Sequence, residues 1–295
     1  MTPVFRLKMA KQKAEALLKQ EGIAALPVDP FALAAGRDIV VQAKPDATDG
    51  VSGMLLRHGD SFGILYATYI PSEGFQRFSV GHELGHYFLD GHIDHLLPKD
   101  GVHASRAGFV SGDPYELEAD NFAAGLLMPA GLCKRFIVRR DAGLAAIEAL
   151  AAECRTSLTA TAIRYAELTD DAVAVIISTG PTIDYCFLSE GMKSLPQLSW
   201  LKKGSPVPAR SETARLSAAA SRVLKGDRIV DEIDVMDWLG GTRSAIVTEE
   251  AVGLGRYGKT LTVLSSTTIG QEEDGDDEAD DDEAVAERWT PRFHR

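Results

Sequence analysis

The sequence predicts an α+β protein whose N-terminal and C-terminal domains are joined by a helical connector. Three observations lead to this prediction. Two helical patterns in the first half carry histidines and acidic residues, two further helical patterns lie near the middle, and short runs rich in valine and isoleucine alternate with glycine turns in the second half. We therefore expect domains at residues 1–135 and 171–268, the connector at 136–170, and an acidic terminal segment at 269–295.

The most informative motif is an H-E-x-x-H sequence formed by His82, Glu83 and His86. Apolar residues recur around it at helical spacing, which predicts one helix over residues 73–89. Residues four apart in a helix lie about 40° apart around its axis, so both histidines can bind one metal ion. Glu83 lies about 100° from His82, where it can reach a metal-bound water without ligating the metal. A zinc site is therefore predicted, and a buried helix with two histidines and no metal is the alternative.

A catalytic zinc ion takes three protein ligands, so a third ligand must come from another segment. A second helix is expected over residues 113–129, with Asp113 as its N-cap. Glu116 and Asp120 fall on one face of this helix, and Glu118 points about 160° away. We expect Glu116 to ligate zinc and Asp120 to accept the outer N–H of a ligating histidine. Glu118 is the second ligand candidate, and a capping-box role for Glu116 is the alternative.

The H-E-L-G-H motif and the later pattern E-x-E-A-D-x-F-A-A-x-L-L-M-P together resemble the ImmA/IrrE family of metallo-endopeptidases, whose domain is a minimal zincin. The resemblance covers about residues 30–130. A short helix after residues 27–31 and strands at 51–56 and 62–66 fit it as well. The resemblance thus implies that the N-terminal domain is zincin-like.

The resemblance also implies that His82, His86 and Glu116 bind Zn²⁺ and that Glu83 is the catalytic base. Zinc would polarise the scissile carbonyl while Glu83 takes a proton from the attacking water. Characterised family members resemble stress or mobile-element regulators that cleave a helix-turn-helix repressor and thereby release transcription. We therefore expect a zinc-dependent endopeptidase that cleaves a protein substrate, with a transcriptional repressor as the expected substrate.

The sequence does not decide the roles of several polar residues near the motif. A further donor to the oxyanion is expected, and no spacing rule selects among Tyr66, Tyr69, Tyr115 and His103. His92 and His95 are expected in a solvated loop, because the helix ends before Gly91.

The strand at residues 61–67 is expected to form a sheet edge, where an extended peptide can pair with it. A glycine-containing loop at 94–112 is an alternative cover for this strand. That loop is expected to act either as a gate or as a plain connection.

Two helices are expected at residues 145–153 and 159–168, separated by a short turn as in a helix-turn-helix motif. The second helix carries a single cation, Arg164, and no cluster that would neutralise phosphates. We therefore do not expect DNA binding. In the ImmA/IrrE family this region resembles such a motif while serving packing or pairing.

The C-terminal domain is expected to combine a strand pair, one helix and two further β-like stretches. The expected ranges are 172–178, 183–188, 211–224, 244–248 and 260–264. Longer family members resemble this pattern by carrying a GAF-like sensor region here. A structural or dimer-forming domain is the alternative, so formation of a homodimer stays open.

The net charge of −12 is unevenly distributed. Residues 271–295 contain eleven acidic and three basic residues, so the rest of the chain is close to neutral. The run at 272–283 cannot bury apolar area, and we expect a disordered, solubilising tail. Competition for a basic partner, shielding of a site and DNA mimicry are the alternatives.

A cytoplasmic protein is expected. The chain begins with a lysine-bearing amphipathic helix rather than a signal peptide, and no apolar run is long enough to span a membrane. Cys133, Cys154 and Cys186 are odd in number and lack C-x-x-C spacing, which indicates reduced thiols.

The main alternative to a peptidase is a non-catalytic, antitoxin-like regulator that binds a partner without cleaving it. Glu83 argues against this alternative, because a purely structural zinc site does not need it. A DNA-binding regulator is the remaining alternative, and no membrane partner is expected.

Overall fold

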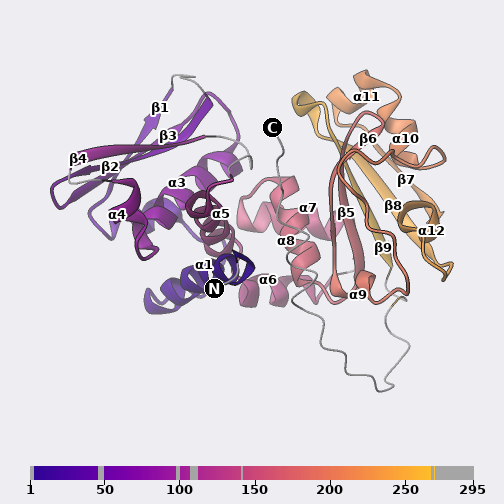
Figure 1. Ribbon diagram of the computed structural model, residues 1–295, viewed down its shortest axis with the longest axis horizontal. Helices are drawn as coiled ribbons and strands as arrows, with labels where there is room; N and C mark the ends of the chain where they lie inside the picture. Colours follow the sequence, from indigo (N-terminus) through magenta and orange to yellow (C-terminus); the bar gives the residue numbers. More distant parts are fainter. Residues whose placement is uncertain are drawn as a thin grey trace, which may run out of the picture. The chain divides into compact units, whose positions relative to one another are not determined.

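The computed structural model describes residues 3–45, 50–97, 100–106, 112–140, 142–266 and 269. These residues form two compact units, each built around its own sheet (Figure 1). Among the described residues, the first unit contains those up to Leu132 together with Ala151–Ser157, and the second contains Cys133–Leu150 and those from Leu158 to 269. The α+β class is thus confirmed. The predicted boundaries at 135, 170 and 268 stay a prediction, and the acidic run at 272–283 lies outside the described residues.

The first unit combines a four-stranded sheet with helices. Its strands are β1 (Val40–Lys44), β2 (Val51–His58), β3 (Ser61–Ala67) and β4 (Asp100–Arg106). Its helices are α1 (Pro3–Gln20), α2 (Pro30–Ala35), α3 (Glu73–Phe88), α4 (His92–Leu96) and α5 (Pro114–Leu127). The helices expected at 73–89 and 113–129 are confirmed as α3 and α5.

The strand order in this sheet is β1-β3-β2-β4, with β1 parallel to β3 and the other pairs antiparallel. The prediction that residues 61–67 form a sheet edge is therefore wrong, because β1 covers that side of β3. The expectation of a loop at 94–112 is also wrong in part. Its described residues include the end of α4 and all of β4, and β4 forms the edge beside β2.

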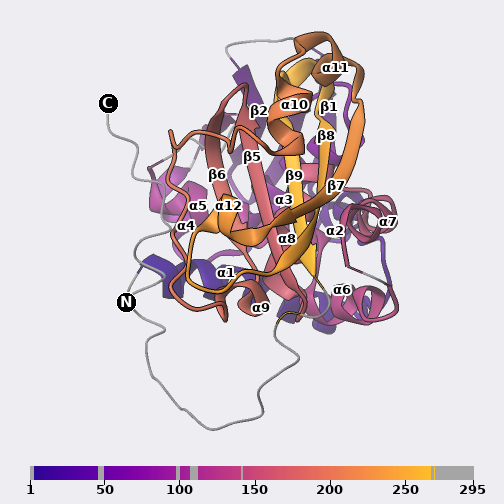
Figure 2. The same cartoon turned by 90° about the vertical axis from the view of Figure 1, so that its right-hand side faces the viewer.

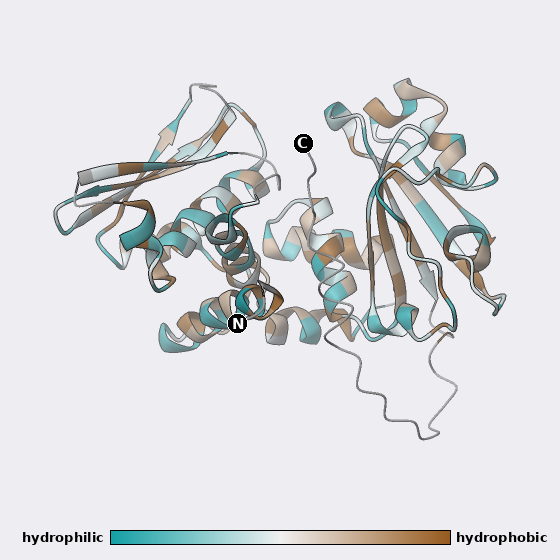
Figure 3. Cartoon of the chain, in the orientation of Figure 1, coloured by the Kyte–Doolittle hydropathy of each residue, from teal (hydrophilic) through white to brown (hydrophobic). Residues whose placement is uncertain are grey.

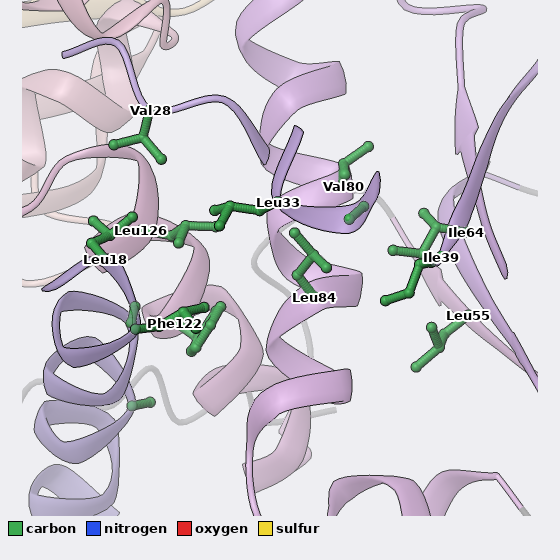
Figure 4. Close-up of a cluster of buried hydrophobic side chains, with 14 of the residues drawn as sticks. Leu18, Val28, Leu33, Ile39, Leu55, Ile64, Val80, Leu84, Phe122 and Leu126 are labelled. Atoms are coloured by element: carbon green, nitrogen blue, oxygen red, sulfur yellow. The ribbon is translucent and has the colours of Figure 1, made fainter. Parts of the chain in front are cut away.

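The core of the first unit lies on both sides of α3. Val80 and Leu84 of α3 are fully buried and face Ile64 of the sheet (Figure 4). Phe122 of α5 and Leu18 of α1 belong to the same core on the other side of α3. Burial on both faces removes a large apolar area from water and holds α3 between the sheet and the helices.

Helices α3 and α5 approach closely because small residues face each other. A Cβ at Gly85 would lie 3.0 Å from Ala119 Cα, and a Cβ at Gly81 would lie 3.4 Å from Ala123 Cβ. Side chains any larger would separate the helix axes. This contact sets the distance between the polar residues of the two helices.

The helices that follow are α6 (Ala130–Ile137), α7 (Leu144–Cys154) and α8 (Leu158–Leu168). The two helices expected at 145–153 and 159–168 are present as α7 and α8. Arg155, with a positive φ of 55°, lies in the turn between them.

The second unit is built on a five-stranded antiparallel sheet of order β6-β5-β9-β8-β7, seen face-on in Figure 2. Its strands are β5 (Ala172–Thr179), β6 (Thr182–Leu188), β7 (Arg228–Asp234), β8 (Ile246–Gly253) and β9 (Thr260–Ser266). Its further helices are α9 (Glu190–Lys193), α10 (Glu212–Ser217), α11 (Ala220–Lys225), α12 (Val235–Leu239) and the short 3₁₀ helix Gly255–Tyr257. The inner strand β5 is hydrophobic along most of its length (Figure 3) and almost wholly buried.

Two expectations for this unit needed correction. The helix expected at 211–224 is two helices, because Ala219 adopts an extended conformation before α11 begins. Strand β7 was not expected at all.

Two neighbouring acids of β8 hold helix ends on opposite faces of this sheet. Glu249 is fully buried and accepts hydrogen bonds from Thr213 N at 2.9 Å and Thr213 Oγ1 at 2.6 Å, at the start of α10. Glu250 accepts a hydrogen bond from Leu144 N at 2.6 Å, at the start of α7. Both carboxylates satisfy amide groups that have no partner within their own helix.

Across the described residues, no helix combines the length and the apolar character that crossing a bilayer requires.

Candidate metal centre

Helix α3 presents the motif residues on its inner side. Ser72 caps the helix by accepting a hydrogen bond from Phe75 N at 3.4 Å. His82, Glu83 and His86 are all buried, at 7%, 0% and 0% exposure. The capped start and the buried apolar neighbours fix the direction in which these three side chains point.

Helix α5 supplies the third candidate ligand. Asp113 accepts a hydrogen bond from Tyr115 N at 2.9 Å and so caps the helix by itself. The side chain of Glu116 is directed to histidines: its carboxylate oxygens lie 3.4 Å from His82 Nε2 and 3.3 Å from His86 Nε2. The two Nε2 atoms are 3.0 Å apart. One ligand atom from each of these three residues lies within 4.8 Å of the others.

These separations fit one small divalent ion. Ligands bound tetrahedrally at about 2.0–2.1 Å from zinc are separated by about 3.3 Å. The observed separations of 3.0, 3.3 and 3.4 Å lie close to that value. Calcium, with bonds of about 2.3–2.6 Å and a demand for six or more oxygen ligands, fits this nitrogen-rich set poorly.

The outer nitrogen of His82 is held by Asp120, whose Oδ1 lies 2.8 Å from His82 Nδ1. Burial alone would lower the pKa of His82, but Asp120 and Glu116 outweigh it and raise the pKa to about 10. Because Asp120 takes the Nδ1 side of the ring, Nε2 is the nitrogen that faces Glu116, and it would bind a metal ion after losing its proton. Asp120 thus occupies the position expected from the sequence.

The outer nitrogen of His86 is held by a residue that the sequence reasoning placed wrongly. His92 is fully buried in α4, and its Nδ1 lies 3.0 Å from His86 Nδ1, so the expectation of a solvated loop is wrong for His92. The sequence feature that could have indicated this position is Gly91. Its left-handed conformation, with φ 81°, turns the chain back and starts α4. Burial lowers the pKa of His86 to about 3. His95 is exposed, as expected, but it also lies in α4 rather than in a loop, and it stacks on Tyr115.

Glu118 lies apart from the three candidate ligands. Its carboxylate is 3.5 Å from His92 Nε2 and forms an ion pair with Arg6 of α1. The two glutamates therefore have separate partners, as their positions on opposite faces of α5 require.

His103 of β4 completes the surroundings of Glu116. Its Nε2 lies 2.9 Å from Glu116 Oε1, and its ring centroid is 4.7 Å from that of His86. Burial would raise the pKa of Glu116, but hydrogen bonds from His103, His82 and His86 outweigh it and hold the pKa well below its usual range. Of the other oxyanion candidates, Tyr66 packs its ring on Phe31, and Tyr115 packs its ring on His92.

Glu83 is the least satisfied polar group of the centre. It is fully buried, and within the described part of the chain no hydrogen bond of ordinary geometry reaches either carboxylate oxygen, although the Ser105 hydroxyl is near enough to counter part of the effect of burial on its pKa. Burial raises its pKa to about 7. The carboxylate fits against β2 because residue 53 is glycine: a Cβ at Gly53 would lie 2.5 Å from Glu83 Oε1. Nothing in the sequence alone pointed to Gly53.

Comparison with known proteins gives one family match and a set of structural matches. The family model described as the IrrE N-terminal-like domain matches residues 34–165, which include all the residues of the centre. No curated protein matches the chain. Among eleven matching chains of solved structure is one described as a Mycobacterium tuberculosis transcriptional regulator. It is 12% identical, with a TM-score of 0.56 over 90% of this chain and 82% of that chain, so the likeness concerns the fold.

Proposed function

Because the chain belongs to the ImmA/IrrE family of metallopeptidases through residues 34–165, we propose that it is a zinc-dependent endopeptidase that cleaves a protein substrate. The observation that carries this proposal is the convergence of His82 Nε2, His86 Nε2 and the two oxygens of the Glu116 carboxylate at separations that fit a single ion. Two imidazoles and one carboxylate are a donor set typical of catalytic zinc.

Zinc, when bound, would supply the Lewis acid that polarises the scissile carbonyl and activates a water molecule. Asp120 and His92 orient the two imidazoles by holding their Nδ1 atoms, which keeps both Nε2 atoms directed inward. His103 orients the Glu116 carboxylate by contacting its Oε1 through Nε2.

Glu83 is the proposed general base. A buried carboxylate without a hydrogen bond of ordinary geometry is free to accept a proton from water, and a pKa of about 7 suits proton transfer near neutral pH. The same carboxyl group can then pass the proton to the leaving amine.

The proposed substrate class is a helix-turn-helix transcriptional repressor, cleaved in a stress or mobile-element response in the cytoplasm. This part of the proposal rests on the family, and the fold that the chain shares with a transcriptional regulator is consistent with it. The second unit, with its helices on both faces of an antiparallel sheet (Figure 1), is the proposed GAF-like sensor.

DNA binding by α7 and α8 is the less favoured function. Arg164, the one cation of α8, is 6% exposed and donates a hydrogen bond to Glu167 at 2.9 Å. A buried, paired arginine does not contact phosphates. The proposed role of this helix pair is packing.

The direct test is to incubate the protein with a helix-turn-helix protein encoded beside it, with zinc or with a chelator, and to separate the products by size. We expect fragments with zinc alone. Glu83→Gln should reduce the cleavage rate by about 10²-fold or more, because general-base catalysis contributes that much, while zinc stays bound. Glu190→Gln, at an exposed glutamate of the second unit, is the matched control. Full activity of Glu83→Gln would refute the assigned base, and binding without cleavage by the wild type would favour the non-catalytic regulator.

A second test addresses the ligands. Glu116→Ala should abolish stoichiometric zinc binding, measured by competition with a chromophoric chelator, because it leaves two protein ligands. Glu118→Ala should retain bound zinc, because the Glu118 carboxylate pairs with His92 and Arg6 and is not one of the three candidate ligands. Zinc loss in Glu118→Ala with retention in Glu116→Ala would reverse the assignment.

A further inference from the structure

The basic segment at residues 134–140 has no part in the proposed reaction. Lys134, Arg135, Arg139 and Arg140 lie within these seven residues, and no acid lies among them. All four side chains are exposed, and Val138 between them is 79% exposed. In a protein of net charge −12, this segment is a concentrated positive surface.

Local packing keeps these cations on the outside. The segment starts in α6, where Cys133 and Ile137 are buried and hold the opposite side of the helix against the protein. Arg140 folds back on the helix: it donates a hydrogen bond to the Phe136 carbonyl at 2.8 Å, and its guanidinium lies 3.5 Å from the centre of the Phe136 ring. The charges therefore stay close together rather than spreading along an extended chain.

Two contacts within the second unit place the basic segment beside the end of β9. Lys134 Nζ lies 4.0 Å from Asp170, two residues before β5, and the first residue of β5 pairs with Ser266 at the end of β9. Beyond the other end of the segment, a Cβ at Gly143 would lie 3.5 Å from Ser265 Oγ. The basic segment thus runs past the point at which the C-terminal residues leave the sheet.

The residues that follow this exit point have the complementary charge. The segment 272–283 contains ten acidic residues and no basic residue, and it begins six residues after Ser266. Six residues span at most about 20 Å, and so short a tether gives an effective concentration of about a millimolar. We propose that the acidic segment 272–283 binds the basic segment 134–140 of its own chain.

The acidic segment 272–283 is favoured over nucleic acid as the partner of the basic segment. A nucleic-acid duplex must compete for the basic segment from solution, whereas the acidic segment is tethered within about 20 Å of it. When the acidic segment is bound to them, the four cations are shielded from the phosphates that they would otherwise attract. The proposal is independent of the peptidase function.

Zero-length crosslinking of the full-length protein tests the contact. A carbodiimide joins carboxylates to lysine amines that touch them, and Lys134 is the single lysine of the basic segment. We expect crosslinked peptides that join Lys134 to residues 272–283, with a yield that falls steeply at about 1 M salt, where the Debye length is about 3 Å. Lys225 is the matched control, because it is exposed on α11 near the other end of the sheet (Figure 1).

The second measurement compares the wild type with a variant in which the acidic segment carries no charge. With the ten acids of 272–283 changed to asparagine or glutamine, Arg139 and Arg140 should react with phenylglyoxal about fivefold faster than in the wild type, because their shield is removed. Lys134→Arg keeps the charge, so it should lose the crosslink while Arg139 and Arg140 stay protected. Equal crosslinking of Lys134 and Lys225, or equal arginine reactivity with both tails, would overturn the proposal. Equally tight binding of a labelled DNA duplex with both tails would assign the basic segment to nucleic acid and overturn it as well.

Discussion

The carboxylate of Glu83 occupies space that any side chain at position 53 would fill. Gly53 lies on β2, and a Cβ there would lie 2.5 Å from Oε1, 3.1 Å from Cγ and 3.2 Å from Cδ of Glu83. The carboxylate is the far end of a flexible side chain, so it would move rather than the strand. Gly53 is therefore the residue that sets where the proposed base stands.

Gly53→Ala is expected to lower kcat by about 10²-fold with little change in KM or in zinc affinity, since a displacement of about 1 Å has that effect on a positioned catalytic group. The measurement is steady-state cleavage kinetics together with zinc competition. Gly63→Ala in the neighbouring strand is the control, because its Cβ would meet Val40 O at an ordinary 3.6 Å.

The shorter side chain in Glu83→Asp should restore part of the activity in the Gly53→Ala background, because it withdraws from the added methyl group. Equal losses in Gly53→Ala and Gly63→Ala would show that the strand, and not the carboxylate, is disturbed.

At the scale of elements, the metal centre depends on how closely α3 and α5 approach. Gly85→Ala should weaken zinc binding by about tenfold or more, because its Cβ would meet Ala119 Cα at 3.0 Å and force the helices apart. Gly81→Ala lies one turn earlier on the same face, with its nearest contact at 3.4 Å, and should bind zinc nearly as well as the wild type. Zinc titrations of both variants make the comparison, and similar affinities would show that the helix spacing tolerates a methyl group.

Sequence reasoning was strongest where spacing within one helix decides the geometry. His82, His86 and Glu116 could be selected as candidate ligands because helical periodicity fixes which side chains share a face, and the structure brings the three together. The contact of His92 with His86 could not be predicted, because it depends on a turn at Gly91 that brings α4 back onto α3.

The strands that the sequence did not reveal, β1, β4 and β7, all lie at sheet edges. Strand β1 has two partly buried residues among five, and β7 has one buried and two partly buried residues among seven, so neither shows the alternation that marks a half-buried strand. Such a strand is stabilised by the partner beside it, which is a property of the tertiary structure. Residues 61–67 were assigned to a sheet edge because β1, the strand that pairs with them, was not predicted.

At the scale of the whole molecule, both units keep their thiols from solvent. Cys133 and Cys154 are fully buried and Cys186 is 2% exposed, and burial raises the pKa of Cys186 above its usual range. The native protein should therefore react slowly with Ellman's reagent, and three thiols should appear on addition of denaturant. Rapid reaction of any thiol in the native protein would show that its part of the structure opens readily.

The paired acids of β8 have a consequence for how the second sheet assembles. Glu249 and Glu250 cap α10 and α7 from opposite faces of one strand. Sliding β8 by one position would invert both side chains, remove both caps together and leave two buried amide ends without acceptors. The two caps therefore favour a single register of β8, because a shifted register would lose hydrogen bonds on both faces of the sheet.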